Sequence, residues 1–372
     1  MKLVGVPKEI KSHEYRVGLT PGSVNEIVSR GVKVLIEKSA GEGIGLMDED
    51  YIAAGAEIRN TADEIFEQSD MIVKVKEPQP SECIKLSRGQ TLYTYLHLAP
   101  DPKQAELLLE SGCTAIAYET VSDAHNGLPL LVPMSQVAGR MSIQAGAHCL
   151  EKAAGGSGML LGGVPGVAPA EVVVIGGGVV GTNAVRMAMG MEASVTVLDK
   201  SLNRLRELDF QFGSKLNTIY ATNEQLEHYV TQADLVVGAV LVAGAKAPKL
   251  VTRDMLKKMR PGSVVVDVAI DQGGCFETSR ATTHQEPTYV EEDIVHYCVA
   301  NMPGAVARTS TFALNNATLP FALDLVTKGV KQALLEDPHL MNGLNIHDGK
   351  VTHKAVAEAL NKPYADPKAL FE

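Results

Sequence analysis

The sequence predicts an α/β protein with two Rossmann-like domains, each a mostly parallel sheet flanked by helices, with a cleft between them. The chain has 372 residues, which is more than one hydrophobic core usually supports. Short apolar runs typical of buried strands alternate with helical patterns along most of the chain, as in sheets whose parallel strands are joined by helices. A glycine-rich motif also follows one of these strands, which is typical of nucleotide-binding sheets.

The N-terminal third contains the first series of predicted elements. Thr20 and Pro21 form a typical helix start, an N-cap followed by proline at the first helical position, and Gly31 would end that helix. Thr61 and Glu64 have the spacing of a capping box that opens a short helix. Apolar runs predict strands at residues 2–6, 32–37, 71–75 and 91–96.

A second series begins after a long helical pattern at residues 133–153 and a glycine-rich segment. Helices are expected to start near Val179 and Ser201, and another helical pattern covers residues 309–336. Strands are predicted at residues 171–175, 194–198, 235–240 and 264–268. We therefore expect a discontinuous first domain, residues 1–130 and 308–372, with a second domain, residues 131–307, inserted into it.

Composition excludes several classes of function. The net charge of −10 argues against a nucleic-acid surface and against an anionic membrane. The N-terminus lacks the apolar region of a signal peptide, and no apolar stretch is long enough for a membrane span. The five cysteines are far apart and form no metal-ligand spacing, so we expect reduced thiols in a cytoplasmic protein and no bound metal.

The strongest motif is the G-x-G-x-x-G of residues 176–181, which follows a predicted strand and opens a predicted helix. In such a motif Gly176 permits a tight turn, Gly178 lets the backbone approach a pyrophosphate, and Gly181 lets helix and strand pack closely. Val179 and Val180 begin the helix, whose free N–H groups would hold the pyrophosphate.

Asp199 ends the strand that follows this helix. An acid at that place accepts hydrogen bonds from the ribose hydroxyls and repels the 2′-phosphate of NADP, which favours NAD. Lys200 and Arg204 lie nearby and keep NADP open as an alternative. The structural alternative is a glycine turn that binds nothing, with Asp199 as a helix cap.

Three polar residues follow predicted strands of the first domain. Arg16 suits a carboxylate, Lys76 could polarise a carbonyl, and His97 is a candidate proton carrier near neutral pH. Taken singly, each residue type more often has a structural role as an ion pair, a strand-edge charge or a hydrogen-bonded core residue. Asp271 lies in a glycine-containing loop after the strand at residues 264–268, where an Asx-turn is the structural alternative.

Together these pieces resemble the alanine dehydrogenase family, and the resemblance runs from end to end. The relatives of that family include the NAD-binding part of the proton-translocating transhydrogenase and, more distantly, saccharopine dehydrogenase. The matching segments are GVPKEIKSHEYRVGLTP (5–21), KVKEP (74–78), YLHLAPD (95–101), VPMSQVAGRMS (132–142), VVIGGGVVGTNA (173–184), VLVAGAKAPKLV (240–251), DVAIDQGG (267–274) and NMPGAVARTST (301–311).

The resemblance implies a role for each candidate. Arg16 would bind the substrate carboxylate, Lys76 would hydrogen-bond the substrate, and His97 and Asp271 would transfer protons. The residues implied to bind NAD are Ser135, Gly176, Gly178, Val179, Val180, Gly181, Asp199, Arg204, Val240, Leu241, Asn301 and Met302. The first domain would then be the substrate domain and the second the NAD-binding domain of a homohexamer.

The first motif departs from the family pattern at two positions. His13 stands where the family usually has Asn, and Gly18 stands where it usually has Ala. Both positions flank Arg16 without replacing it, so they bear on the fine geometry of substrate binding and not on the class of reaction.

The implied function is the reversible oxidation of L-alanine to pyruvate and ammonia with reduction of NAD. Discrimination against one extra methylene is typically about 10–200-fold, so serine or 2-aminobutyrate would react slowly. One alternative is the soluble NAD(H)-binding subunit of a transhydrogenase, a branch in which other residues replace Lys76 and His97. The other alternative is a sensor that binds NAD without turnover. The sequence leaves the physiological direction open.

Overall fold

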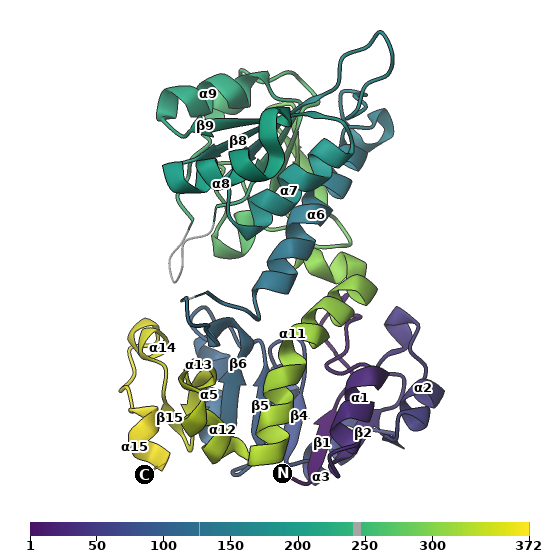
Figure 1. Ribbon diagram of the computed structural model, residues 1–372, viewed down its shortest axis with the longest axis vertical. Coiled ribbons are helices and arrows are strands. Elements are labelled where there is room, and N and C mark those ends of the chain that lie inside the picture. The colour runs from purple at the N-terminus through teal and green to yellow at the C-terminus, as the bar shows by residue number, and fades with distance from the viewer. Residues whose placement is uncertain (126, 241–246, 372) are drawn as a thin grey trace. The chain divides into compact units, whose positions relative to one another are not determined.

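The computed structural model describes residues 1–125, 127–240 and 247–371. The chain divides into two compact units, Met1–Met134 with Val306–Glu372, and Ser135–Ala305 (Figure 1). Each unit contains one mostly parallel sheet flanked by helices. The predicted α/β class with two such sheets is therefore confirmed.

The first sheet has the order β15-β14-β6-β5-β4-β1-β2-β3 among the described residues. Strands β1 to β6 are parallel, and β14 and β15 extend the sheet antiparallel beyond β6. Because β2 and β3 lie on one side of β1 and β4 on the other, the strand order reverses between β1 and β4. The strands are β1 (Leu3–Val6), β2 (Lys33–Glu37), β3 (Glu57–Arg59), β4 (Met71–Val73), β5 (Thr91–Thr94), β6 (Thr114–Ala117), β14 (Leu344–His347) and β15 (Lys350–Val351).

Both faces of the first sheet are covered. Helices α3, α4, α5 and α14 contribute to a core on one face, and α11 packs beside α1 and hydrogen-bonds to Tyr93 of β5 (Figure 1). The helices are α1 (Pro21–Val28), α2 (Asp48–Ala53), α3 (Ala62–Gln68), α4 (Pro80–Cys83), α5 (Pro102–Ser111), α11 (Ala307–Lys328), α12 (Val330–Glu336), α13 (Pro338–Met341), α14 (Lys354–Ala359) and α15 (Pro367–Phe371), with the 3₁₀ turns η1 (Glu42–Ile44) and η2 (Tyr118–Thr120).

The predicted helix starts of this unit agree with the structure. Thr20 Oγ1 accepts a hydrogen bond from the backbone of Ser23 at the start of α1. Thr61 and Glu64 form the expected capping box of α3. The single helix predicted over residues 309–336 is wrong, because α11 and α12 are separate helices. The break falls at Gly329, whose φ of 80° interrupts the helical backbone.

The second sheet has the order β12-β13-β11-β10-β7-β8-β9, and all pairs except β12 with β13 are parallel. Here the strand order reverses between β7 and β10. Crevices at such reversals, at the carboxyl ends of the strands, are where open α/β sheets bind ligands. The strands are β7 (Glu171–Ile175), β8 (Ser194–Asp199), β9 (Leu216–Tyr220), β10 (Leu235–Gly238), β11 (Val264–Asp267), β12 (Thr288–Glu291) and β13 (Ile294–Tyr297).

The central strands of this sheet are apolar at nearly every position because both of their faces are buried. Val172 and Val174 join the core that contains α6, α7 and α8, whereas Val173 and Ile175 join the core that contains α9 and α10. The remaining elements are α6 (Val132–Cys149), α7 (Val179–Gly190), α8 (Leu202–Phe212), α9 (Asn223–Gln232), α10 (Arg253–Leu256), η3 (Lys152–Ala154), η4 (Gly213–Lys215), η5 (Val268–Gln272) and η6 (Met302–Val306). Within the described ranges, no helix has the length and apolarity that crossing a bilayer requires.

Candidate active site

Arg16, Lys76 and His97 follow three adjacent parallel strands of the first unit. Arg16 lies in the loop after β1, Lys76 follows β4 and His97 follows β5. The segments after β4 and β5 stay hydrogen-bonded beyond the strands, since the Thr94 hydroxyl donates to the carbonyl of Lys76 at 3.0 Å. The three residues therefore follow the carboxyl ends of adjacent parallel strands, beside the reversal of strand order.

The guanidinium of Arg16 is buried and held by Glu14. Its Nε and Nη2 donate to the two carboxylate oxygens of Glu14 at 2.7 and 2.6 Å, and Nη1 donates to Sδ of Met134 at 3.2 Å. Burial lowers the pKa of Arg16, but the hydrogen bonds and charge of Glu14 outweigh burial, so the pKa is raised. The arginine is therefore a fixed cation that contacts a weak thioether acceptor at Nη1.

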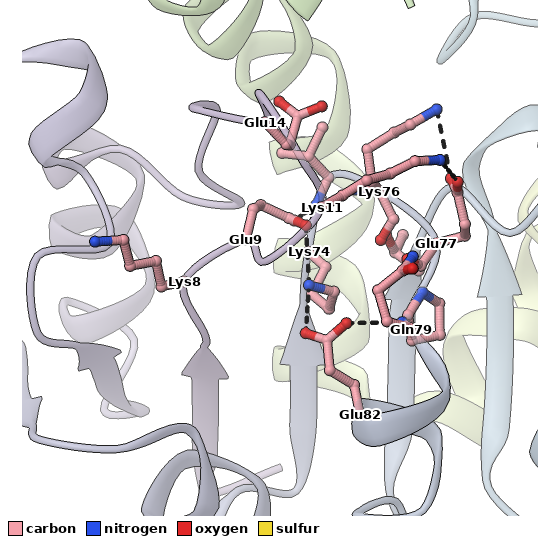
Figure 2. A network of polar contacts seen from close by, with 12 residues as sticks. Lys8, Glu9, Lys11, Glu14, Lys74, Lys76, Glu77, Gln79 and Glu82 are labelled. Carbon is pink, nitrogen blue, oxygen red and sulfur yellow. Dashed lines mark hydrogen bonds and ion pairs between the residues drawn. The ribbon is translucent and has the colours of Figure 1, made fainter.

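Lys76 lies beside Glu77 at the end of β4. Its Nζ is 3.4 Å from a carboxylate oxygen of Glu77, and the other oxygen of Glu77 pairs with Lys11 (Figure 2). Burial acts to raise the pKa of Glu77, but the charges of Lys76 and Lys11 and the hydrogen bond from Lys11 prevail and lower it to about 2. Glu77 is therefore ionised near neutral pH and forms ion pairs with both Lys76 and Lys11.

His97 has a left-handed backbone conformation and an exposed side chain. Its φ is 50°, and its N–H donates to Oε1 of Glu119 at 2.6 Å. The same carboxylate accepts the N–H of Leu96 at 3.1 Å, so Glu119 holds two successive peptide groups. The imidazole stacks on the ring of Tyr95, with centroids 5.7 Å apart and planes 8° from parallel. The position of the histidine ring is therefore supported by both its backbone and its neighbour.

In the second unit, the loop after β7 has the conformation that its glycines allow. Gly176 has a φ of 97°, and a Cβ there would lie 2.8 Å from the carbonyl oxygen of Ala239. A Cβ on Gly181 would lie 1.8 Å from the carbonyl oxygen of Gly176, so helix α7 and the turn pack with no room for a side chain. A Cβ on Gly178 would meet no atom within 4 Å, so there is open space beside this residue. The start of α7, with Val179 and Val180, thus fits a pyrophosphate.

Asp199 and Arg204 both contact the glycine loop. The Asp199 carboxylate accepts the backbone N–H groups of Gly177 and Ser201, each at 2.7 Å. Arg204 donates from Nε to the carbonyl of Gly177 and from Nη2 to Thr182 Oγ1, both at 2.6 Å, and its Nη1 pairs with a glutamate. Each Asp199 oxygen retains further acceptor capacity, which fits ribose hydroxyls.

Asp271 is exposed in η5, directly after β11. The buried carboxylate of Asp267 holds this loop at both ends. It accepts the N–H of Ala269 at 3.1 Å, the N–H of Cys275 at 2.9 Å and the hydroxyl of Ser279 at 2.5 Å. Burial raises the pKa of Asp267. Asp267 therefore has a structural role in the loop that carries Asp271.

The other predicted cofactor residues lie at separate places of the second unit. Ser135 is half-buried in the first turn of α6. Val240 follows β10 and lies beside Gly176. Asn301 has a φ of 68° and accepts a hydrogen bond from His284 at its carbonyl oxygen, whereas the side chain of Met302 is buried in the core. Leu241 lies outside the described residues.

No group of three or more His, Cys, Asp or Glu side chains in the described ranges is arranged to hold a metal ion. The sequence did not single out four supporting carboxylates. One is Glu9, whose Oε1 accepts the backbone N–H of Lys76 at 3.3 Å, and the others are Glu14, Glu119 and Asp267. An acidic residue in a loop usually lies in solvent, so its type gave no signal. Only their proximity in sequence to Arg16 and to Asp271 could have singled out Glu14 and Asp267.

The fold and the site define a class of protein. Two Rossmann-like units, a glycine loop at a helix start and polar residues at adjacent strand ends are typical of an oxidoreductase that uses a pyridine nucleotide. Two family models match the chain: "Alanine dehydrogenase/PNT, N-terminal domain" over residues 5–138, and "Alanine dehydrogenase/PNT, C-terminal domain" over residues 142–354. The chain belongs to the alanine dehydrogenase/PNT family, which confirms the resemblance inferred from the sequence.

Similar proteins match over nearly the whole chain. The alanine dehydrogenase of Halomonas elongata is 60% identical over 368 residues, covering 99% of both chains. That of Bacillus subtilis is 53% identical over 363 residues, covering 97% of this chain and 96% of the relative. A solved L-alanine dehydrogenase structure has a TM-score of 0.94 at 50% identity and covers 96% of this chain and 99% of that chain.

A transhydrogenase structure from Sinorhizobium meliloti is a more distant match. It has a TM-score of 0.83 at 24% identity and covers 94% of this chain and 100% of that chain. At this identity the likeness concerns the fold alone. The transhydrogenase alternative therefore gains no support beyond the shared architecture.

Proposed function

We propose that this chain catalyses the reversible oxidative deamination of L-alanine to pyruvate and ammonia, with NAD as the oxidant. The observation that carries the proposal is that Arg16, Lys76 and His97 each follow one of three adjacent strands of the first unit. The similarity to alanine dehydrogenases over nearly the full length supports it.

The substrate carboxylate binds the guanidinium of Arg16. Glu14 holds the Nε edge of this guanidinium, and the substrate carboxylate binds at Nη1 in place of the sulfur of Met134. The ammonium of Lys76 hydrogen-bonds the substrate oxygen and stabilises the negative charge that develops on it. Since Lys76 is 3.4 Å from Glu77, it can turn to a substrate without losing a short hydrogen bond.

His97 carries protons for the hydrolytic part of the reaction. Loss of a hydride from the α carbon of alanine leaves an iminium. The exposed imidazole accepts the proton of the water that adds to the iminium carbon, and it returns a proton as ammonia leaves. Asp271 of the second unit is the second proton-transfer group. NAD, when bound, would be the oxidant and would accept the hydride from the α carbon of alanine.

The glycine loop and its neighbours fit NAD better than NADP. Open space at Gly178 and the free N–H groups at the start of α7 accommodate a pyrophosphate. The negative charge of Asp199 disfavours a 2′-phosphate, and Arg204, the cation beside it, already contacts Gly177, Thr182 and a glutamate. The remaining contacts to the cofactor come from Ser135, Val179, Val180, Gly181, Val240, Asn301 and Met302.

We further propose a cytoplasmic homohexamer, as the family resemblance implies. Light scattering after size-exclusion chromatography tests the assembly. A mass of six chains supports it, and a stable smaller species contradicts it.

The function is tested by assaying NAD reduction by the purified chain against a panel of amino acids. L-alanine should give the highest kcat/KM, with serine and 2-aminobutyrate slower by about 10–200-fold. Pyruvate and ammonia should oxidise NADH in the reverse assay. Tight NADH binding without turnover of any amino acid would contradict the proposal and favour a sensor.

A further inference from the structure

A buried cluster of charges lies beside the segment that carries Lys76. The Nζ of Lys74 is 2.9 Å from Oε2 of Glu9 and 2.8 Å from Oε1 of Glu82. The exposed fractions of these side chains are 0% for Lys74, 2% for Glu9 and 3% for Glu82. Figure 2 shows the ammonium of Lys74 between the two carboxylates. We call these three residues the Lys74 cluster.

The two oxygens of Glu9 have different partners. Oε2 pairs with Lys74, whereas Oε1 accepts the backbone N–H groups of Val75 at 2.7 Å and of Lys76 at 3.3 Å. Glu9 comes from the loop after β1, so its carboxylate ties that loop to the end of the neighbouring strand β4. Glu9 is thus the member of the cluster that touches the backbone of Lys76.

Glu82 has a different second contact. Its Oε2 accepts the N–H of Gln79 at 2.8 Å at the start of α4, so its side chain caps that helix. It shares Lys74 with Glu9 but has no hydrogen bond to the backbone of Val75 or Lys76 among the contacts of the described residues. The two carboxylates can therefore be compared as test and control.

Stability is a weak reason for such a cluster. Burial lowers the pKa of Lys74, yet the two carboxylates outweigh burial and raise it, so all three groups depend on one another. Replacing a whole buried ion cluster by apolar residues is often neutral or stabilising, so a buried ion pair is weak evidence for a role in stability. A role in fixing the backbone explains its place at the end of β4 better than stability does.

We propose that Glu9 is a positioning residue for Lys76, holding the peptide groups of Val75 and Lys76 through Oε1 while Lys74 fixes the carboxylate through Oε2. This inference rests on the proposed role of Lys76 in substrate binding. A glutamine at position 9 has one acceptor oxygen and one amide group in place of two acceptor oxygens. It cannot accept from Lys74 and the backbone with separate oxygens, so the Lys76 segment would shift.

The test is a double-mutant cycle on the full chain with Glu9→Gln, Lys76→Ala and the combined variant. Glu9→Gln should lower kcat/KM for pyruvate roughly 10- to 100-fold, the size expected of a misplacement near 1 Å. In the Lys76→Ala background the same change should cost less than about 2-fold, because the group that Glu9 positions is gone. The affinity for NADH should stay unchanged in all variants. Fully additive losses would overturn the inference.

Glu82→Gln is the matched control, and Glu9→Asp is the second variant if Glu9→Gln does not fold. Glu82→Gln should lower kcat/KM by less than about 3-fold, since it disturbs Lys74 without touching the Lys76 backbone. An equal loss in Glu9→Gln and Glu82→Gln would indicate a merely structural cluster and overturn the inference. Glu9→Asp, which keeps the charge but shortens the reach, should replace Glu9→Gln in the same cycle. Near-normal activity of Lys76→Ala would overturn the role of Lys76 itself, a different outcome from additivity.

Discussion

In the first unit, buried and half-buried carboxylates hold the segments after the strands, whereas in the second unit the loop after β7 takes its shape mainly from glycines. Glu9, Glu14 and Glu119 each accept backbone or side-chain N–H groups next to Lys76, Arg16 and His97. By contrast, Gly176 and Gly181 allow a turn and a close helix contact that no other residue would fit. The segments at the strand ends of the first unit are thus held by carboxylates, whereas the loop after β7 in the second unit depends on residues without side chains.

The two edges are suited to different ligands. A pyrophosphate binds backbone N–H groups, so the second unit needs close backbone approach. A small amino acid with a carboxylate must be oriented by side chains, so the first unit needs fixed charged groups. Variants at the two edges should therefore fail in different ways, one in turnover and the other in cofactor binding.

The largest effect is expected for His97→Ala. Loss of a positioned proton carrier typically lowers turnover by about 10²–10⁴-fold, and we expect kcat to fall within this range. The side chain is exposed, so the thermal midpoint should change little. Steady-state assays in both directions measure kcat, with thermal unfolding as the control. Turnover within about 3-fold of the unchanged protein would remove the role of His97.

A smaller effect, on cofactor affinity, is expected for Gly181→Ala. The new Cβ would lie 1.8 Å from the carbonyl oxygen of Gly176, so the glycine turn must shift. We expect a loss of stability of about 1–3 kcal/mol and a Kd for NADH raised more than about 10-fold. NADH fluorescence titration and thermal unfolding measure both.

Gly190→Ala is the matched control, because Gly190 ends the same helix and a Cβ there meets no atom within 4 Å. This variant should keep the Kd for NADH and gain or lose less than about 1 kcal/mol. Equal behaviour of the two alanine variants would contradict the packing argument for the glycine loop.

The predictability of the two edges from sequence differs for the same physical reason. Glycine is required at 176 and 181 for local reasons, namely the tight turn after β7 and the packing of the first turn of α7 against it. The G-x-G-x-x-G motif therefore predicts both positions directly. The valine-rich strands and the capping box of Thr61 and Glu64 are equally local patterns, and the structure agrees with them.

Glu9 was not predictable as a supporting carboxylate because its contacts depend on strand order. Glu9 contacts the backbone of Lys76 only because β4 lies next to β1, although 67 positions separate the two residues in sequence. The same holds for β14 in the C-terminal segment, which pairs with β6 and was not foreseen. Strand neighbours far apart in sequence leave no periodic signal.

A still smaller effect, on the choice between NAD and NADP, is expected for Asp199→Asn. The substitution removes the negative charge and keeps one acceptor oxygen for Gly177 or Ser201. The repulsion between the Asp199 carboxylate and a 2′-phosphate is worth about 1–2 kcal/mol near a protein surface. Without it, the preference for NAD over NADP should fall about 10-fold. The ratio of kcat/KM with the two cofactors measures it. An unchanged ratio would show that Asp199 does not discriminate between them.

The smallest effect is expected for Glu77→Gln and concerns how the stability of the first unit depends on pH. The pKa of Glu77 is lowered to about 2, so the stability from its charge is complete above its ordinary pKa near 4.5 and is lost as the pH falls towards 2. Glu77→Gln should be less stable by about 1 kcal/mol at pH 6, and this difference should shrink at pH 3. Thermal midpoints at the two pH values test it. A difference that grows on acidification would contradict the assigned pKa shift.

A crystal structure of the chain with pyruvate shows whether the strand ends of the first unit bind the substrate. We predict the pyruvate carboxylate within about 3 Å of the Arg16 guanidinium, and the ketone oxygen at a similar distance from Lys76 Nζ. Pyruvate bound elsewhere, with Arg16 still in contact with Met134 and Lys76 still beside Glu77, would contradict the account.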